Sequence, residues 1–530
     1  MQLVAYGAQD IYLTGNPQIT FFKVVYRRHT NFSMEAIEQT FDGNVDFGGE
    51  VVATISRNGD LVGRMYLEHS FHLDHGPGSG HSSSPSDGVP GIRERVGDAL
   101  IKECSLEIGG QLIDRHTGLW NRVYSDLNEF NPTGHFGADI SSRSESVLAA
   151  KGAGTLYQLM TGNCHGFNAN KAGQGALFGA GEGNQGQVVN GFTYRDIHGA
   201  DFIHGRVYIP FNFWFCKNPG LALPLIALQY HEVKINLKIE HEGRLIYAVN
   251  DVPSTSENCG TVYAYSRHAN HSHDFKLWVD YIYLDTDERR RFAQVSHEYL
   301  IEQLQYQTNN LTTPNSDIDL YFNHPVKEII WCSKSIGTEG RNRTGGDVGN
   351  LVGNGMSARE DPSSGEVSLD QMGGKWNLKL NGHDRFEKRN TKYFTRTQVW
   401  QHHTGYGALP TVGIYSADWK NLSPSAPVLV STNTGNKVDL VPGTIGNDSI
   451  AVYSFSLKPE EHQPSGTCNF SRIDSAQLIG ENLQIANATT NNHLLKTLDN
   501  DENKIELTIF AVNYNVLRIM SGMGGLAYSN

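Results

Sequence analysis

The sequence predicts an all-β protein made of two consecutive β-sandwiches, with long loops and a few short helices. Three observations predict this architecture: a strand-turn pattern occurs twice, several segments alternate apolar and polar residues, and the chain is 530 residues long. Single hydrophobic cores stop growing at about 250–300 residues, so a chain of this length is expected to form two large domains.

The repeated pattern lies at residues 104–122 and again at residues 376–396. In each copy an alternating apolar segment runs into a turn, at Gly109-Gly110 and at Asn381-Gly382. A polar stretch follows and ends in Arg-x-Thr-x-(Leu or aromatic)-aromatic-x-Arg, with two extra residues in the second copy. Solenoid repeats recur within about 20–50 residues, far less than this separation. The pattern therefore indicates a duplicated domain.

Alternation of period two predicts the strands. Residues 231–240 alternate strictly, and residues 207–215 show the same period. One side of each strand should therefore face a core. The core-facing residues of these two segments are Val233, Ile235, Leu237, Ile239, Val207, Ile209, Phe211, Phe213 and Phe215. Pro210 predicts a strand edge or a bulge, because proline cannot donate to the ladder. Residues 276–284 and 505–520 are rich in aromatic and branched residues and are also expected to form strands.

The domain boundaries follow from a sequence similarity between the last predicted strand of each sandwich. Residues 279–284 match residues 512–517 at the first, third and sixth places. The sequence thus predicts an N-terminal arm at 1–14, a first sandwich at 15–285, a linker at 286–302, a second sandwich at 303–520 and a tail at 521–530. Short helices are expected within 218–228 and within 287–304.

Four long interruptions rich in Gly, Ser and Asn fall inside the two sandwiches. They span residues 76–91, 131–199, 337–374 and 406–447. Structureless stretches of this length are uncommon in compact domains unless they are functional surface loops. We expect them to be displayed at one end of the scaffold.

Composition excludes several classes of protein. The formal net charge of −13 disfavours direct binding of nucleic acid, which needs clustered Lys and Arg. The basic run 289–291 follows three acidic residues and is expected to be a solvated linker. No signal peptide and no apolar run of about 20 residues is visible. The six cysteines lack C-x-x-C spacing and are expected to be reduced thiols in a chain made in the cytosol.

Several stretches closely resemble the double jelly-roll major capsid proteins of large icosahedral DNA viruses, particularly those that infect algae. The stretches that carry the resemblance are residues 3–10, 14–23, 55–61, 219–233, 279–285, 464–474 and 515–528. They extend from one end of the chain to the other. The sequence departs from the family mainly in the four long loops.

The resemblance implies two eight-stranded jelly rolls, an architecture that capsid and lectin domains share. It implies a homotrimer whose six jelly rolls give a nearly hexagonal outline, with the long loops facing outward. Such a subunit is a late structural protein that contacts neighbouring capsomers, minor capsid proteins and penton proteins. The resemblance also implies indirect association with an internal membrane, no direct contact with nucleic acid, and assembly of the virion capsid in the host cytoplasm.

The sequence motifs of the enzyme classes considered are incomplete or absent. No catalytic, cofactor-binding or metal-binding residue is therefore predicted. His-Glu occurs at His231, His241 and His297, but none continues to H-E-x-x-H. Residues 181–186 fit G-x-G-x-x-G without the strand and helix that a dinucleotide site needs. The histidines at 268, 271 and 273 are expected to be solvated loop residues. No nucleophile elbow is present.

The alternative function is a carbohydrate-binding or carbohydrate-active β-sandwich protein, since lectins share the jelly roll. Such a protein should act as a monomer or small oligomer, whereas a capsid subunit should form an obligate trimer with a large interface. Covalent sugar is a separate question. Asn310 and Asn487 begin N-x-[ST] sequons near predicted strand ends and are the candidate acceptors. The competing interpretation, that both sequons occur by chance, is equally open.

Overall fold

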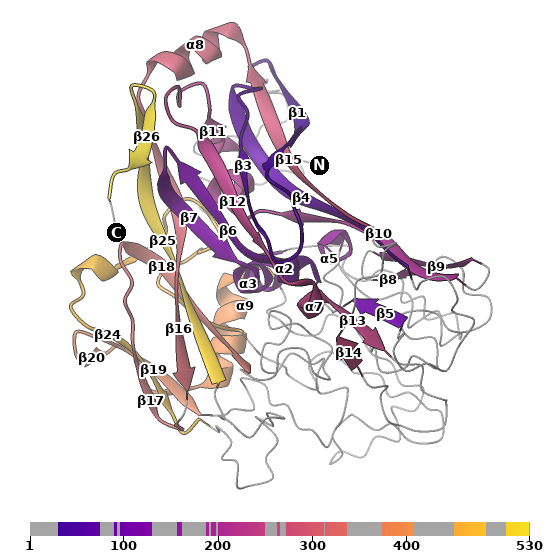
Figure 1. Ribbon diagram of the computed structural model, residues 1–530. Helices are drawn as coiled ribbons and strands as arrows, with labels where there is room; N and C mark the ends of the chain where they lie inside the picture. Colours follow the sequence, from indigo (N-terminus) through magenta and orange to yellow (C-terminus); the bar gives the residue numbers. More distant parts are fainter. Residues whose placement is uncertain are drawn as a thin grey trace, which may run out of the picture.

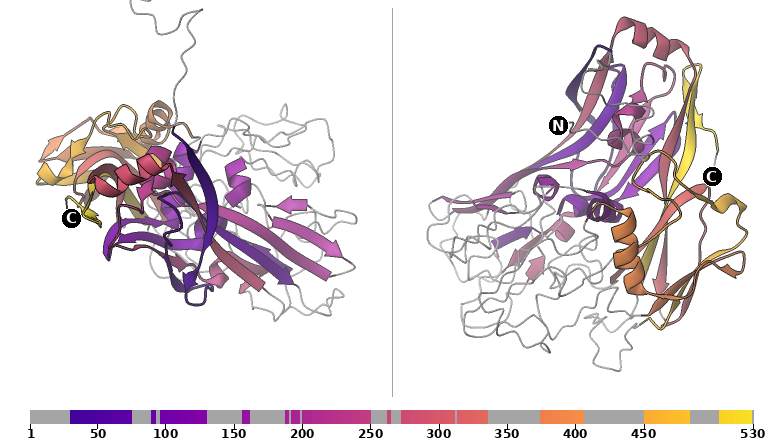
Figure 2. Two further views of the ribbon diagram at one scale, coloured as in Figure 1. Left: turned by 90° about the horizontal axis from the view of Figure 1, so that it is seen from above. Right: turned by 180° about the vertical axis from the view of Figure 1, so that it is seen from behind.

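The computed structural model consists mainly of strands arranged in two β-rich units, which lie side by side (Figure 1). The described residues are 30–74, 89–92, 96–129, 156–161, 187–189, 192–197, 200–249, 262–264, 272–311, 313–335, 374–405, 450–483 and 505–528. Seen from above and from behind, the second unit stays on one side of the first (Figure 2).

The first unit is a sandwich of two antiparallel sheets. One sheet has the order β1 (Phe32–Gln39), β15 (Ser272–Leu284), β4 (Leu61–Asp74), β10 (Ala200–Pro210), β9 (Phe192–Ile197) and β8 (Gln187–Val189), with β11 (Leu223–Pro224) also paired to β4. The other has the order β2 (Phe41–Asp42), β3 (Glu50–Thr54), β12 (Val233–Ile239), β6 (Ile101–Ile108) and β7 (Gln111–Thr117). A small third sheet joins β14 (Val262–Ala264), β13 (Ile246–Val249) and β5 (Val89–Ile92).

The second unit has two sheets of the same kind. One has the order β16 (His297–Leu311), β25 (Ile505–Met520), β18 (Pro325–Ser335) and β22 (Ile450–Ser454), with β23 (Cys468–Asn469) on β18 and β26 (Met523–Leu526) on β25. The other has the order β17 (Ser316–Asp319), β24 (Ala476–Glu481), β19 (Lys375–Leu380) and β20 (His383–Asp384), with β21 (Arg389–Asn390) also on β19.

The two units share one topology. The order β1-β15-β4-β10 corresponds to β16-β25-β18-β22, and β3-β12-β6-β7 corresponds to β17-β24-β19-β20. The duplication inferred from residues 104–122 and 376–396 is therefore visible in the sheets.

The repeated turn has the same backbone in both units. Gly109 and Gly110 have φ of 60° and 80°, and Asn381 and Gly382 have φ of 51° and 77°. Two consecutive positive φ values fit the tight hairpin turns that favour Gly and Asn. A helix follows in both cases: α3 (Gly118–Asn128) in the first unit, and the π-helical turn η4 (Tyr393–Thr397) leading into α9 (Gln398–His402) in the second.

Burial confirms the predicted alternation in β12. Val233, Ile235, Leu237 and Ile239 are each at most 2% exposed and belong to the core of the first unit. The residues between them are half-buried. The strand thus has one face in the core, as its period of two predicts.

The segment 207–215 needs a correction. Strand β10 ends at Pro210, which is in register with Tyr66 of β4, and Phe213 is the N-cap of the helical turn α6 (Trp214–Lys217). Pro210 cannot donate to the ladder, the Phe211 N–H still donates to the Met65 carbonyl at 3.0 Å, and the backbone then enters α6. The predicted burial still holds, since Phe211, Phe213 and Phe215 are all at most 4% exposed.

The helices are shorter than predicted. Within 287–304, helix α8 covers Thr286–Gln294, and β16 begins at His297 and pairs with β25 along its whole length. Within 218–228 there is only a 3-10 turn, η2 (Pro219–Leu221), followed by β11. Other short helices are α2 (Val96–Leu100), α5 (Leu156–Thr161), α7 (Glu242–Leu245) and η6 (Phe470–Arg472). In the described part of the chain no helix is long and apolar enough to cross a membrane.

The long interruptions lie largely outside the described residues, and 406–447 does so completely. Two of them nevertheless contain regular structure where they are described. The segment 131–199 includes α5, β8 and β9, and the end of 76–91 enters β5. These elements correct the expectation of structureless loops at those positions.

The buried aromatic cluster of the first unit gives a stability prediction. Phe213 is 0% exposed, and its ring stacks on Phe215 at 5.9 Å and on His116 at 4.8 Å between centroids. We expect Phe213→Ala to lower the free energy of unfolding by ~3–5 kcal/mol. Lys234→Ala, at a 40% exposed side chain on the outer face of β12, should change it by about 0.5 kcal/mol or less. Thermal melts monitored by circular dichroism compare the two, and equal melting temperatures would contradict this packing.

Candidate functional site: the seam between the two units

The two units meet along a seam that buries the outer face of one sheet. Helix α3 of the first unit packs on the sheet β16-β25-β18-β22 of the second. The buried residues of this cluster are Leu119, Trp120, Val123, Leu127, Leu304, Ile330, Cys332, Val399, Ile450, Val452, Phe510 and Val512. Trp120 and Phe510 lie at its centre, with ring centroids 5.2 Å apart. Both side chains would be open to water if the units separated.

Strand β7 runs beside β16 and adds polar contacts to the seam. A carboxylate oxygen of Asp114 accepts a hydrogen bond from the Leu304 backbone N–H at 3.1 Å. The amide of Gln303 donates to the backbone carbonyl of Ile113. The Arg115 guanidinium lies 5.2 Å from the ring centre of Tyr306. These contacts fix the register of the two strands.

At one end of the seam, the hairpin of β25 and β26 packs against the first unit. The Tyr230 N–H donates to the Gly522 carbonyl at 2.9 Å. Gly522 has φ +81°, and a Cβ at Gly524 would lie 2.7 Å from the Leu228 side chain, so both positions need glycine. Leu517 and Ile519 of β25 belong to the core of the first unit. The closing strand of the second unit therefore completes the core of the first.

A buried carboxylate lies beside the apolar cluster. Lys327 Nζ is 2.6 Å from Glu302 Oε1, and Lys217 Nζ of the first unit is 3.8 Å from Glu302 Oε2. Burial alone raises the pKa of Glu302, but Lys327, a hydrogen bond from His462 and Lys217 outweigh it and lower this pKa to about 2. Glu302 is therefore charged at neutral pH and is held by cations from both units.

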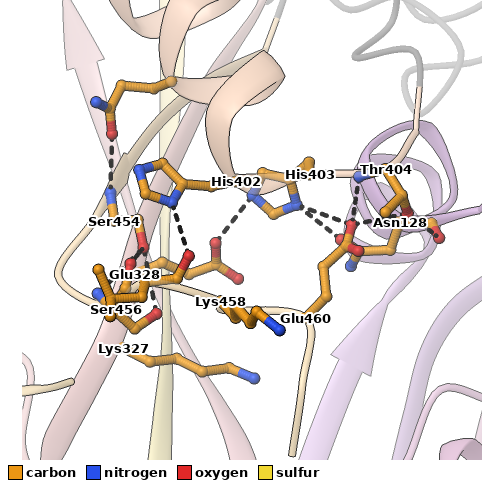
Figure 3. Close-up of polar contacts among 12 residues, drawn as sticks. Asn128, Lys327, Glu328, His402, His403, Thr404, Ser454, Ser456, Lys458 and Glu460 are labelled. Atoms are coloured by element: carbon orange, nitrogen blue, oxygen red, sulfur yellow. Dashed lines mark hydrogen bonds and ion pairs between the residues drawn. The ribbon is translucent and has the colours of Figure 1, made fainter. Parts of the chain in front are cut away.

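His403, which follows α9 and has a fully buried side chain, contacts residues of both units (Figure 3). Its Nε2 lies 3.0 Å from Glu328 Oε2 of β18, and its Nδ1 lies 3.4 Å from Glu460 Oε1. The same Nδ1 is 2.8 Å from Asn128 Oδ1, at the end of α3 in the first unit. The imidazole thus joins two carboxylates of the second unit to the first unit.

The backbone next to His403 continues this connection. Glu460 accepts from the Thr404 N–H at 2.8 Å, and the Gly405 N–H donates to the Leu127 carbonyl at 2.7 Å. A Cβ on Gly405 would collide with the backbone of Asp126 and Leu127. The close approach of the two chains at this point therefore requires glycine.

The charges around His403 set its protonation. Burial alone lowers the pKa of His403, but Glu328 and then Glu460 outweigh this effect and raise the pKa to about 9. Burial likewise raises the pKa of Glu460, and its hydrogen bonds from His403 and Thr404 bring the pKa below the usual value. The imidazolium is therefore the form present at neutral pH.

The residues singled out from the sequence do not form a common site. His231 Nδ1 contacts the Gly524 carbonyl at 2.9 Å within the seam, whereas His297 Nε2 contacts the Phe292 carbonyl. His241 is exposed. Asn310 lies in β16, exposed and in register with Glu506, and Asn487 lies outside the described residues. The segment 181–186 also lies outside them.

His273 corrects the expectation of a solvated loop histidine. It belongs to β15, its side chain is 5% exposed, and its Nδ1 lies 3.2 Å from His69 Nε2. Burial and then His273 hold the pKa of His69 well below its usual value. His268 and His271 lie outside the described residues. Over the part of the chain that is described, no group of three or more His, Cys, Asp or Glu is arranged to hold a metal ion.

Sequence comparison covers the whole chain. The family model for the N-terminal part of major capsid proteins matches residues 20–285, and the model for the major capsid protein of large eukaryotic DNA viruses matches residues 288–426 and 440–525. This chain belongs to the major capsid protein family of large eukaryotic DNA viruses. The resemblance inferred from residues 3–10 through 515–528 is confirmed.

Individual relatives support the same family assignment. The chain is 42% identical to a major capsid protein of Pyramimonas orientalis virus over 532 residues, covering 100% of this chain and 99% of the relative. It is 36% identical to that of Paramecium bursaria Chlorella virus 1, with the same coverage. Its structure matches a chain of the PBCV-1 virus capsid with TM-score 0.57 and 32% identity, covering 96% of this chain and 100% of that one. A Faustovirus major capsid protein has TM-score 0.54 at 12% identity over 97% of this chain and 94% of that one, and shares the fold.

These relatives settle the class of protein. The chain is a major capsid protein with a double jelly-roll fold, a structural protein of the virion and not an enzyme. The seam described above is thus the contact that holds one jelly roll of a capsid subunit to the other.

The His403 cluster gives a pH prediction. Because the pKa of His403 is about 9 in the folded protein and 6.5 when unperturbed, its contribution is complete below about pH 6.5 and is lost as pH rises through about 9. That contribution is roughly 3 kcal/mol for a shift of this size. We expect the melting temperature to fall between pH 6.5 and 9.5, and His403→Gln to remove most of that fall. His383→Gln, at an exposed histidine of β20, is the control. An unchanged pH profile in His403→Gln would contradict the assignment.

The Glu302 cluster gives a second prediction for the seam. Lys327→Met leaves the buried Glu302 carboxylate without its nearest cation, so we expect a loss of ~3–5 kcal/mol in the free energy of unfolding. Lys458→Met, at a 65% exposed side chain paired with Glu461, should cost less than about 1 kcal/mol. Urea denaturation measures both variants. A loss in Lys327→Met no larger than in the control would show that the cluster is not coupled to stability.

Proposed function

We propose that three copies of this chain form a capsomer with a pseudo-hexagonal outline in the shell of an icosahedral virion. The observation that carries this proposal is the equal strand order of the two units, together with the family that the chain belongs to. A subunit with two similar jelly rolls lets three copies present six similar units around a threefold axis. A single jelly roll needs six copies for the same outline.

The partners of such a capsomer follow from its place in a shell. We propose contacts with neighbouring capsomers, with minor capsid proteins and with penton proteins, and indirect association with an internal membrane. Assembly takes place in the host cytoplasm. These partners rest on the family resemblance, and the match to a chain of the PBCV-1 virus capsid supports self-association.

We further propose that the chain divides into an arm at 1–14, jelly rolls at 15–285 and 303–520, a linker at 286–302 and a tail at 521–530. Helix α8 lies within this linker, and β16 starts inside it at His297. Asn310 stays a candidate for glycosylation, because its side chain is exposed near the end of β16. Asn487 stays a candidate on its sequence alone.

The carbohydrate-binding alternative is not favoured. The family models cover both halves of the chain and describe capsid proteins. A jelly roll on its own does not indicate lectin activity, since the fold hosts many functions.

One mass measurement tests the proposal. Light scattering coupled to gel filtration at micromolar concentration should give three times the 58.7 kDa of the chain. The mass of the denatured chain from infected cells should exceed 58.7 kDa by a glycan that Asn310→Gln or Asn487→Gln reduces. A monomer under native salt would contradict the capsomer, and an unmodified denatured mass would contradict glycosylation only.

A further inference from the structure

Two imidazoles face each other inside the core of the first unit. His69 of β4 and His273 of β15 lie on neighbouring antiparallel strands, and His69 Nε2 is 3.2 Å from His273 Nδ1. His69 is 4% exposed, and the side chain of His273 is 5% exposed. This distance leaves room for a single hydrogen between the two nitrogens, so one ring donates and the other accepts.

Aromatic rings enclose the pair. The ring of His69 stacks on Phe275 with centroids 4.4 Å apart, and the ring of Phe71 lies 5.3 Å from it. Phe47, in the connection between β2 and β3, meets the His273 ring edge-on at 4.5 Å. Because these rings replace water around the imidazoles, a positive charge on His69 is costly.

Among the described residues, the carboxylate that contacts the pair is Glu242 of α7. Its Oε1 lies 3.7 Å from His273 Nε2, so a proton on His273 has a counter-charge. Asp46 directs its Oδ1 to the Phe47 N–H at 2.8 Å. The Glu240 carboxylate is also engaged, because it accepts from the His241 N–H at 2.9 Å.

The charged neighbours on the two strands point to the other side of the sheet. Glu68 of β4 and Asp274 and Lys276 of β15 alternate with the core-facing residues. On that side Arg206 Nε lies 3.0 Å from Glu68 Oε1, and Lys276 Nζ lies 3.8 Å from Asp274 Oδ2. His69 therefore has its partner imidazole, and not a carboxylate, as its polar contact.

The two rings differ in what a proton meets. A proton on His273 Nε2 faces Glu242, whereas a proton on His69 Nε2 faces the second imidazole. Burial and then His273 hold the pKa of His69 well below its usual value. If both rings carried two protons, two N–H groups would point at each other across 3.2 Å. Neutral pH therefore favours the hydrogen-bonded pair, and acid opposes it.

The second unit shows that this fold does not require such a pair. Strands β18 and β25 take the places of β4 and β15 there, and their core-facing residues are apolar. These residues are Val326, Ile329, Trp331, Leu507, Ile509 and Ala511. Because burying polar groups costs free energy unless they are hydrogen-bonded, an imidazole pair in the first core calls for a reason other than packing.

The pair lies where several segments are fastened together. It joins β4 to β15, while Phe47 attaches the segment 43–49 and Glu242 attaches α7. The ring of His241 lies against Gly48 of the same segment, because a Cβ there would be 2.5 Å from its Nδ1. Helix α7 leads directly into β13, the central strand of the small sheet β14-β13-β5. The pair thus sits at the attachment of this third sheet.

We propose that His69 and His273 form an acid-sensitive latch within the subunit. At neutral pH the hydrogen bond between the rings holds α7 and the segment 43–49 on the sheet β1-β15-β4-β10. On acidification a proton from solvent binds His69, the two rings repel each other, and these segments separate from the sheet. The latch lies within one chain, so it is independent of the capsomer proposed above.

The sign of the pH effect follows from the burial of His69. Its pKa lies below 6.5 when the latch is closed, so the open form binds more protons and the closed form loses stability as pH falls through 6.5. His403 acts in the opposite sense, since its contribution is complete below about pH 6.5. The pKa of Glu302 is about 2, well below this range. A loss just below pH 6.5 therefore reports the latch and not the charged clusters of the seam.

Amide hydrogen exchange of the full chain, read by mass spectrometry at pH 7.5, 6.5 and 5.5, tests the latch. After correction for the intrinsic pH dependence of exchange, opening of the segments 43–49, 242–245 and 272–277 should increase below pH 6.5. The increase should approach about tenfold per pH unit, the limit for one proton bound only in the open form. Peptides of β16 and β25 should keep their protection. Unchanged protection of the latch segments would overturn the proposal.

His69→Gln separates the latch from other effects of acid. Glutamine keeps a hydrogen-bonding group toward His273 and does not titrate, so this variant should lose most of the increase in opening. His383→Gln, at an exposed histidine of β20, is the matched control and should retain it. An equal increase in His69→Gln would assign the acid response to another group and overturn the latch.

A measurement on the wild-type chain covers the case in which His69→Gln does not fold, which circular dichroism detects. Slow exchange of the imidazole C2 hydrogen, followed peptide by peptide against pH, gives the titration midpoint of each histidine. The midpoint of His69 should lie below 6.5. A midpoint at or above this value would show that a charge on His69 is not costly in the core, and would overturn the proposal.

Discussion

The structure depends on one burial: the apolar outer face of the sheet β16-β25-β18-β22 must be covered. Ile330 and Phe510 point away from the core of their own sandwich and are buried in a cluster to which α3 of the other unit contributes. A fully buried aromatic or aliphatic side chain contributes roughly 1.5–3 kcal/mol relative to exposure. Because several such residues lie together, opening this face would cost a large share of a typical domain's stability. The two jelly rolls are consequently one structure joined at a core, rather than two domains on a tether.

Buried charges then fix how the units are joined. Glu302 is held between Lys327 of its own unit and Lys217 of the other, and His403 is held between Glu328, Glu460 and Asn128. An unpaired charge at either place would be strongly destabilising, whereas an apolar contact tolerates sliding. The apolar cluster therefore supplies the adhesion, and the charged clusters supply the orientation. This division suits a capsid subunit, in which a small change of angle between the halves is repeated over every copy in the shell.

The sequence predicted the strands whose two faces differ, because alternation reports such faces directly. Val233 to Ile239 and the turns at Gly110 and Gly382 are of this kind. It did not predict the seam, because a strand covered on both faces loses its alternation. Residues 509–512 are such a case: Ile509 and Ala511 face the second core, while Phe510 and Val512 face the first unit. The uninterrupted apolar run in β25 was the one feature of the sequence that indicated burial of both faces.

Because both faces of β25 are buried, the sequence similarity between β15 and β25 does not show which way each side chain points. Val279 faces the core of its own sandwich, whereas Val512, its match by letters, faces the neighbouring unit. His403 and Glu328 could not be found at all, since nothing in the sequence brings residues from α9, β18 and α3 together. Their juxtaposition is a product of how two sandwiches meet, and pattern within a segment does not contain it.

Duplication let the two halves diverge while the topology stayed the same. The helix after β7 has nine buried residues, polar as well as apolar, and its apolar side chains pack on the other unit. Its counterpart after β21 instead presents an exposed tryptophan and basic residues. An internal seam forms during folding at high effective concentration and can be largely apolar. The two copies of one structural element therefore differ in burial: α3 is covered by the other unit, whereas Trp400 of α9 is 80% exposed.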